Sequence, residues 1–240
     1  MTYAYYPGCS LEMSAQEYDR STRAVLGRLG VTLEEIKDWI CCGASIAEST
    51  SRVLASALPG HNLALAERQL PASEVLAPCS ACYLNLKRVE QEVRTSREAS
   101  QELNKALAAE GLSLGEPPTV RHLLDVLAHD IGPEAVAEQV TMDLSELRVA
   151  PYYGCQALRP YPVFDDPEEP RTMHRLVEAL GARPLSPEEW TCGAVCCGAS
   201  LMTTKPQVAL HAVGHILDQV GQAQADVIVT VCPLCQMNLE

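Results

Sequence analysis

Ten of the eleven cysteines in this 240-residue chain fall into two sets of five that repeat in the same order. Each set has a single cysteine, then an adjacent pair, then a closing pair of the form Cys-x-x-Cys. The stretches between them hold 31, 36 and 2 residues in the first set and 40, 34 and 2 residues in the second. The first set is Cys9, Cys41, Cys42, Cys79 and Cys82, and the second set is Cys155, Cys196, Cys197, Cys232 and Cys235.

The residues around the cysteines repeat as well. A run of matches in the same register indicates an internal duplication, because chance does not place similar residues at several corresponding positions. The matching segments are Tyr6–Cys9 with Tyr152–Cys155, the Cys-Cys-Gly-Ala-Ser run at 41–45 with that at 196–200, and Ala-Pro-Cys-Ser-Ala-Cys-Tyr-Leu-Asn-Leu at 77–86 with Thr-Val-Cys-Pro-Leu-Cys-Gln-Met-Asn-Leu at 230–239.

The duplication predicts two domains, residues 1–140 and 141–240, with the junction between Ile131 and Leu147. A chain of 240 residues is long enough to form two small cores. After Cys82 the chain continues into a charged helical stretch, whereas only five residues follow Cys235. We therefore expect the second domain to be shortened at its C-terminal end, or its last helix to come from another chain.

The elements between the cysteines predict an α/β fold. Short apolar runs predict strands at Tyr3–Tyr6, Val75–Ala77, Arg148–Tyr153 and Val227–Val231. Capping and breaking signals predict helices at residues 14–29, 61–70, 84–107, 121–127 and 171–180, and after Pro206. Strands that alternate with helices are typical of parallel sheets. We therefore expect two similar units, each a small parallel sheet with flanking helices, and cysteines at the strand ends.

The cysteine count and the charge restrict the chemistry. The number of cysteines is odd and the N-terminus lacks the features of a secretory signal, so we expect a cytoplasmic protein whose cysteines bind metal or are redox-active. No stretch approaches the roughly 20 apolar residues that a transmembrane helix needs. A net charge of −13 without any basic run argues against a nucleic-acid partner.

Five thiolates in each set exceed the four protein ligands of a zinc site or a simple iron–sulfur cluster. Side chains of adjacent residues diverge in regular structure, so each Cys-Cys pair can serve one centre only from a turn, which Gly43 and Gly198 permit. Three interpretations stay open: iron–sulfur centres, a structural zinc site in one half, and buried thiols without a metal. The repetition in register favours iron–sulfur centres.

The pattern Cys…Cys-Cys-Gly…Cys-x-x-Cys, present twice, resembles the CCG-domain motif of the cluster-binding catalytic subunit of heterodisulfide reductases (HdrB) and its relatives. The resemblance extends from Tyr5 to Leu239, although the first gap of the second set is slightly long and its second gap slightly short. It implies that all ten cysteines of the two sets are ligands and that each set holds one non-cubane [4Fe–4S] cluster. It further implies that the two clusters face a cleft between the domains.

The activity that this resemblance implies is the reductive cleavage of a disulfide by one-electron steps at the two clusters. Electrons would come from an HdrC-like partner with cubane iron–sulfur clusters and from an HdrA-like flavin partner. Any association with a membrane would go through such a partner. The alternative is a non-catalytic electron-transfer subunit of a CCG-containing oxidoreductase of the succinate/fumarate, lactate or glycolate type, and a zinc-stabilised scaffold is a third.

Two further groups of metal-binding side chains lie outside the two sets. Cys192 is either a buried spare thiol or an alternative ligand of the second cluster. His211 and His215 have a spacing that can bind metal on a helix. The apolar stripe predicted for that helix lies on nearly the opposite face, which favours solvent or a subunit interface for both histidines. The predicted stripe consists of Leu210, Val213, Leu217 and Val220.

Other residues are candidates for supporting roles. His61 could donate a hydrogen bond to a cluster sulfur. Arg159 and Lys205 could bind a carboxylate or phosphate of a substrate. The tyrosines beside the first cysteine of each set are predicted core residues that could also donate hydrogen bonds to cluster sulfurs. These tyrosines are Tyr5, Tyr6, Tyr152 and Tyr153.

Overall fold

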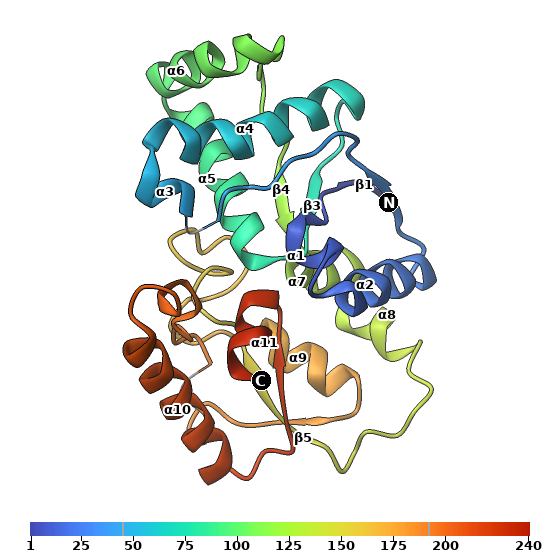
Figure 1. Cartoon of the computed structure of the whole chain (residues 1–240). Helices are drawn as coiled ribbons and strands as arrows, with labels where there is room; N and C mark the ends of the chain where they lie inside the picture. The colour runs from blue at the N-terminus through green and yellow to red at the C-terminus, as the bar shows by residue number, and fades with distance from the viewer. Residues whose placement is uncertain (45, 192) are drawn as a thin grey trace. The chain divides into compact units, whose positions relative to one another are not determined.

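The computed structural model describes residues 1–44, 46–191 and 193–240, and the chain forms two compact units, Met1–Leu123 and Leu124–Glu240 (Figure 1). Each unit contains a parallel sheet with flanking helices, which confirms the predicted α/β class and the duplication. The division between the units lies before the predicted domain boundary at 140/141, which stays a prediction.

The first unit contains a four-stranded parallel sheet in the order β2-β1-β3-β4. Its central strands β1 and β3 are almost wholly buried, which explains their apolar sequences. The strands are β1 (Thr2–Tyr5), β2 (Thr32–Glu35), β3 (Val75–Ala77) and β4 (Val120–His122). The helices are α1 (Gly8–Glu12), α2 (Gln16–Arg28), α3 (Ile46–Thr50), α4 (Arg52–Gln69), α5 (Ser80–Thr95), α6 (Arg97–Leu107) and the 3₁₀ turn η1 (Ala108–Glu110).

The second unit contains a three-stranded parallel sheet in the order β6-β5-β7. A helical segment leads into it from the first unit and consists of α7 (Leu123–Asp125), the π-helix η2 (Val126–Ile131) and α8 (Pro133–Ala137). The strands are β5 (Arg148–Tyr152), β6 (Arg183–Pro184) and β7 (Val227–Thr230). The remaining helices are α9 (Thr172–Ala179), η3 (Ala199–Leu201), α10 (Pro206–Gln222) and α11 (Pro233–Leu239).

The two sheets share one strand order, since β2-β1-β3 corresponds to β6-β5-β7. The cysteines follow the carboxyl ends of these strands in both units. Because the strands are parallel, their carboxyl ends lie at the same edge of a sheet. The topology therefore brings the cysteines of each set to one end of their own unit.

The helix predicted at 84–107 is two helices, α5 and α6, with a break at Ser96. Ser96 adopts an extended backbone conformation, and its side chain accepts a hydrogen bond from the N–H of Ala99, which caps α6. The helix predicted at 14–29 begins at Gln16 and not at residue 14, with Ala15 as its N-cap and without a side-chain cap.

The helix predicted at 121–127 is also wrong at its start, because residues 120–122 form the strand β4. A buried ion pair fixes this strand to α5. Lys87 Nζ donates to Glu90 Oε2 at 2.9 Å and to the carbonyl oxygen of Val120 at 3.2 Å, and the Val120 N–H donates to the same carboxylate oxygen at 2.9 Å. Lys87 and Glu90 are 3% and 0% exposed.

The corresponding strands β3 and β7 differ in their neighbours. β3 pairs with β1 on one side and β4 on the other, whereas within the part of the chain that the structure describes β7 pairs with β5 alone. Leu76 of β3 is 0% exposed, and Val229, at the corresponding position of β7, is 38% exposed. In the described residues β7 is therefore an edge strand of the second sheet, with partly exposed apolar side chains.

The apolar stripe predicted on α10 is only partly confirmed. Leu210 and Leu217 are exposed, and the helix instead buries Ala209 and Ile216. His211 and His215 are not buried, in line with the prediction. Among the described residues, no helix is long and apolar enough to cross a lipid bilayer.

Candidate functional site

The five cysteines of the first unit lie together. The Sγ atoms of Cys9 and Cys41 are 3.6 Å apart, and those of Cys42 and Cys82 are 3.4 Å apart. Cys41 also interacts with Cys42, and Cys82 with Cys79. These contacts connect all five thiols into one continuous group.

The second unit repeats this arrangement. The Sγ atoms of Cys197 and Cys235 are 3.6 Å apart. Cys155 also interacts with Cys196, and Cys232 with Cys235. Two groups of five thiols, one in each unit, are thus formed by residues distant in the sequence.

Each group of five thiols contains both buried cysteines and cysteines nearer the surface. In the first unit Cys9 and Cys41 reach the surface, whereas Cys42, Cys79 and Cys82 are buried. In the second unit Cys196 is exposed, Cys155 is half-buried and the remaining three are buried. Each group therefore has one side enclosed by the fold and one side at the surface, where another molecule can reach it.

Hydrogen bonds between the thiols favour ionisation of some of them. The pKa of Cys42 is lowered to about 3, first by the hydrogen bond with Cys41 and then by that with Cys82, whose own pKa values are raised. Because thiolates are the form that binds metals, the group is partly prepared for ligation at neutral pH.

The second group behaves similarly. The hydrogen bond with Cys155 lowers the pKa of Cys196 to about 6, and the hydrogen bond with Cys235 lowers the pKa of Cys197 to about 7. The pKa values of Cys155 and Cys235 are raised by the same contacts.

Glycines make room for the thiols. Gly8 has a φ of +71°, and a Cβ atom there would lie 2.7 Å from Sγ of Cys82. Gly154 has a φ of +66°, and a Cβ atom there would lie 3.1 Å from Sγ of Cys235. Both positions therefore need glycine for the backbone conformation and for the space.

The tyrosine that opens each repeat supports the Cys-Cys turn. The Tyr6 hydroxyl donates to the carbonyl oxygen of Ile40 at 2.7 Å, and the Tyr152 hydroxyl donates to that of Val195 at 2.6 Å. Ile40 and Val195 directly precede the two Cys-Cys pairs. Burial, reinforced by the neighbouring cysteines, raises the pKa of both tyrosines, which therefore stay protonated donors.

The other two tyrosines make different contacts. The Tyr5 hydroxyl donates to Asp19 Oδ1 at 2.6 Å. The Tyr153 hydroxyl accepts from the N–H of Met173 at 2.7 Å and lies 3.3 Å from Nδ1 of His174. All four tyrosines are buried, as predicted, and the partners of their hydroxyls in these contacts are oxygen and nitrogen atoms.

The remaining candidates have other partners. His61 Nδ1 lies 2.9 Å from Glu110 Oε2, an ion-pair contact outside the thiol group. The Arg159 guanidinium donates to the carbonyl oxygen of Ala194 at 3.1 Å and to Glu168 Oε1 at 2.8 Å. Lys205 is exposed at the start of α10. Cys192 lies outside the described residues.

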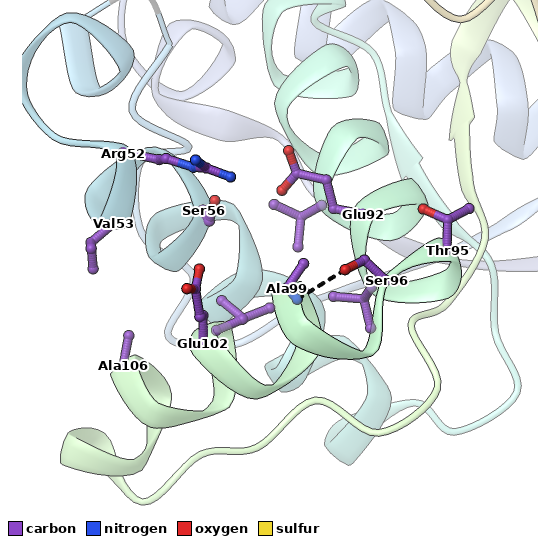
Figure 2. A pocket seen from close by; sticks show the side chains of 12 residues that line it. Arg52, Val53, Ser56, Glu92, Thr95, Ser96, Ala99, Glu102 and Ala106 are labelled. Atoms are coloured by element: carbon purple, nitrogen blue, oxygen red, sulfur yellow. Dashed lines mark hydrogen bonds between the residues drawn. The ribbon is translucent and has the colours of Figure 1, made fainter.

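Two cavities in the described part of the chain, one in each unit, are lined by none of the ten cysteines. A cavity of about 290 Å³ between α4, α5 and α6 is lined by the charged residues Arg52, Glu92 and Glu102 together with hydroxyl and apolar side chains (Figure 2). A cavity of about 270 Å³ in the second unit is lined by Arg159 and by residues 193–195, which lead directly to Cys196. Cys196 itself does not line this second cavity.

The donor set fits an iron–sulfur cluster. Thiolates are the usual ligands of such clusters, and each group offers five of them. The glycine at each centre leaves space where a side chain would crowd the sulfurs.

Known proteins share this pattern. A family model described as the cysteine-rich domain, CCG, matches residues 3–87 and 149–240. A curated relative, the 8-methylmenaquinol:fumarate reductase membrane anchor subunit of Wolinella succinogenes, is 36% identical over 99% of this chain and 81% of its own length.

Two further relatives are named after heterodisulfide reductases. A protein of Archaeoglobus profundus that resembles the B subunit of heterodisulfide reductase is 29% identical over 99% of this chain and 80% of its own length. The B subunit of the ferredoxin:CoB-CoM heterodisulfide reductase of Methanosarcina mazei is 29% identical over 97% of this chain and 77% of its own length.

A crystal structure of a hypothetical protein from Helicobacter pylori has the same fold, with a TM-score of 0.72 and 13% identity. It aligns with 100% of this chain, which spans 43% of that protein. The family match in both units, on the segments that carry the ten cysteines, shows that this chain belongs to the CCG cysteine-rich domain family.

Proposed function

We propose that this chain is an iron–sulfur subunit of a redox complex and that each group of five thiols holds one cluster. The observation that carries the proposal is the gathering of five thiols in each unit from segments up to 73 residues apart in the first set. The ligands of the first cluster would be Cys9, Cys41, Cys42, Cys79 and Cys82, and those of the second Cys155, Cys196, Cys197, Cys232 and Cys235.

Five ligands per centre favour a non-cubane [4Fe–4S] cluster, because a cubane takes four thiolates. When bound, such a cluster supplies one-electron redox chemistry and a Lewis-acidic iron for sulfur. The chain's own residues enclose it on the side of the buried cysteines. The exposed cysteines Cys9 and Cys41, and the exposed Cys196 with the half-buried Cys155, lie on the side from which a substrate or an electron donor would arrive.

The activity we propose first is reductive cleavage of a disulfide, the reaction after which the heterodisulfide reductase relatives are named. Disulfide cleavage needs two electrons, and two one-electron centres in one chain can deliver them. Electrons would come from a partner subunit with cubane clusters and, before it, a flavin subunit.

A second candidate has its own support. The relative from Wolinella succinogenes, with 36% identity, is a subunit of a quinol:fumarate reductase. In a complex of that kind this chain would pass electrons between partners, and neither thiol group would bind a disulfide.

Metal content tests the cluster proposal. We expect about eight irons and eight acid-labile sulfides per chain after anaerobic purification, with little zinc. Cys82→Ala should remove about half of the iron, and Cys192→Ala, which removes a cysteine outside both sets, is the matched control. One or two zinc ions per chain without sulfide would contradict the proposal.

Turnover distinguishes the two activities. With reduced methyl viologen as donor, a disulfide reductase oxidises the dye when the CoB-CoM heterodisulfide is added. A relay subunit with full iron content leaves the dye reduced under those conditions. Such a result would exclude this substrate and favour the second candidate.

A further inference from the structure

An asparagine stands at the same place in both repeats, three residues after the last cysteine of each set. Asn85 lies in α5 and Asn238 in α11. Neither residue can serve as a thiolate ligand, so the proposed function leaves their repetition without a role.

Both side chains hold the second cysteine of the adjacent pair. Asn85 Nδ2 donates to the carbonyl oxygen of Cys42 at 3.1 Å, and Asn238 Nδ2 donates to that of Cys197 at 2.7 Å. The tyrosine hydroxyls already hold the residues before the pairs. Each Cys-Cys turn is therefore fixed at both ends by side-chain hydrogen bonds.

The surroundings of the two asparagines differ. α5 has 16 residues and α11 has seven, and Asn85 is 9% exposed whereas Asn238 is half-buried. The hydrogen bond from the asparagine to the second cysteine is the same in both units although the helices and the burial differ. The bond is therefore linked to the Cys-Cys turn, which both units share.

We propose that Asn85 and Asn238 are positioning residues of the two centres, which fix the Cys-Cys turn for ligation and raise the reduction potential of the bound cluster. The proposal rests on the cluster assignment above. It assigns a function to two side chains that are not ligands.

The chemistry of an amide donor supports both parts of the proposal, the fixed Cys-Cys turn and the raised reduction potential. Adjacent cysteines can serve one centre only from a defined turn, and a hydrogen bond to the carbonyl oxygen of the second cysteine restricts that turn. N–H donors near the ligands stabilise the more negative, reduced state of a cluster.

The test compares Asn85→Leu and Asn238→Leu with Asn104→Leu. Asn104 is the matched control, because it also makes two hydrogen bonds to the backbone, both to Leu114 and none to a cysteine. Asn238→Asp is a second variant at this half-buried position. It removes the amide N–H donor and keeps the size of the side chain. Iron and sulfide per chain and redox titrations followed by electron paramagnetic resonance are measured on the anaerobic full-length protein.

We expect each variant to change the signal of its own centre only and to shift its reduction equilibrium about tenfold toward the oxidised form. For a one-electron couple this equals about 59 mV. Loss of iron from that centre alone would also support the proposal, provided that Asn104→Leu keeps its iron.

Two results would overturn the role of the asparagines and leave the cluster assignment standing. One is unchanged potentials and spectra in iron-containing Asn85→Leu, Asn238→Leu and Asn238→Asp. The other is an equal effect of Asn104→Leu. Absence of iron from the unsubstituted chain would overturn the cluster assignment and this proposal together.

Discussion

Gly8 lies so close to the Cys82 thiol that a Cβ atom at position 8 would stand 2.7 Å from its sulfur. Gly8→Ala should therefore displace a buried ligand and remove about half of the iron, that of the first centre, because the Cys82 sulfur has no room to keep its place. Iron per chain after anaerobic reconstitution measures this effect.

Gly30→Ala is the matched control for this substitution. Gly30 also has a positive φ, +76°, but an added Cβ there meets nothing within 4 Å. Both variants incur the left-handed backbone cost of roughly 1–2 kcal/mol. Only Gly8→Ala should lose iron, and equal losses in the two variants would show that backbone strain alone is responsible.

Cys196 should be the reactive thiol of the second group in protein freed of metal. Its pKa is lowered to about 6 by the hydrogen bond with Cys155, and it is exposed, so its thiolate predominates above about pH 6. The rate of its alkylation by iodoacetamide should rise with pH around that value. Mass spectrometry of peptides identifies the modified residue at each pH.

Cys155→Ala removes the hydrogen bond and should raise the pKa of Cys196 toward the ordinary value of 9.0. Because a lowered pKa means more thiolate at a given pH, raising it should slow alkylation at pH 7 by at least about tenfold. An unchanged pH profile in Cys155→Ala would mean that Cys155 does not set the reactivity of Cys196.

Lys87→Met should destabilise the first unit strongly. It removes one of the two cations beside the buried Glu90 carboxylate, which keeps Arg94 at 2.8 Å. The expected loss of unfolding free energy is therefore at most about 3–5 kcal/mol, which is what breaking a buried pair costs in comparable cases. Arg183→Met breaks the exposed pair with Glu146, and it should cost at most about 1 kcal/mol. Guanidinium denaturation compares the two variants, and similar midpoints would contradict a structural role for the buried pair.

The internal repeat was sufficient for predicting the α/β fold class, because corresponding segments of the two halves follow each other in the same order. Strands precede the cysteines where apolar runs predict them, and β3 has the predicted bounds, Val75–Ala77. The strand β4 was missed because it has three residues, one of them Arg121, and its stability comes from pairing with β3 and from the Lys87–Glu90 pair. These are tertiary contacts that a local pattern does not contain.

The ten cysteines were predicted as two ligand sets from their repetition, and the structure groups them accordingly, although their ligation stays a proposal. The side chains that support them were harder to assign. Asn85 and Asn238 stand in register in the repeat, and this was the signal available for them. Their hydrogen bonds to Cys42 and Cys197 depend on how α5 and α11 lie against the Cys-Cys turns, which spacing does not give.

On helix α10 the sequence pattern predicted burial that the structure does not have. Leu210 and Leu217 have the spacing of a buried stripe, yet they are 53% and 40% exposed. Periodicity identifies an apolar face, but burial also requires a neighbouring element that packs on it. Ala209 and Ile216 are buried because the core of the second unit lies on their side.

The open edge of β7 has a consequence for how the purified chain behaves at high concentration. Among the described residues β7 is paired on one side only, and an exposed apolar edge strand is a template for strands of other molecules, so we expect self-association that increases with protein concentration. Val229→Lys should reduce it, whereas Val25→Lys, on the exposed face of α2, should not. Light scattering at several concentrations measures the difference, and equal scattering by both variants would contradict the role of the edge. If Val229→Lys alone reduces the scattering, the solubility of the purified protein depends on the strand β7, which lies before the last Cys-x-x-Cys pair, and not on the chemistry of the thiols.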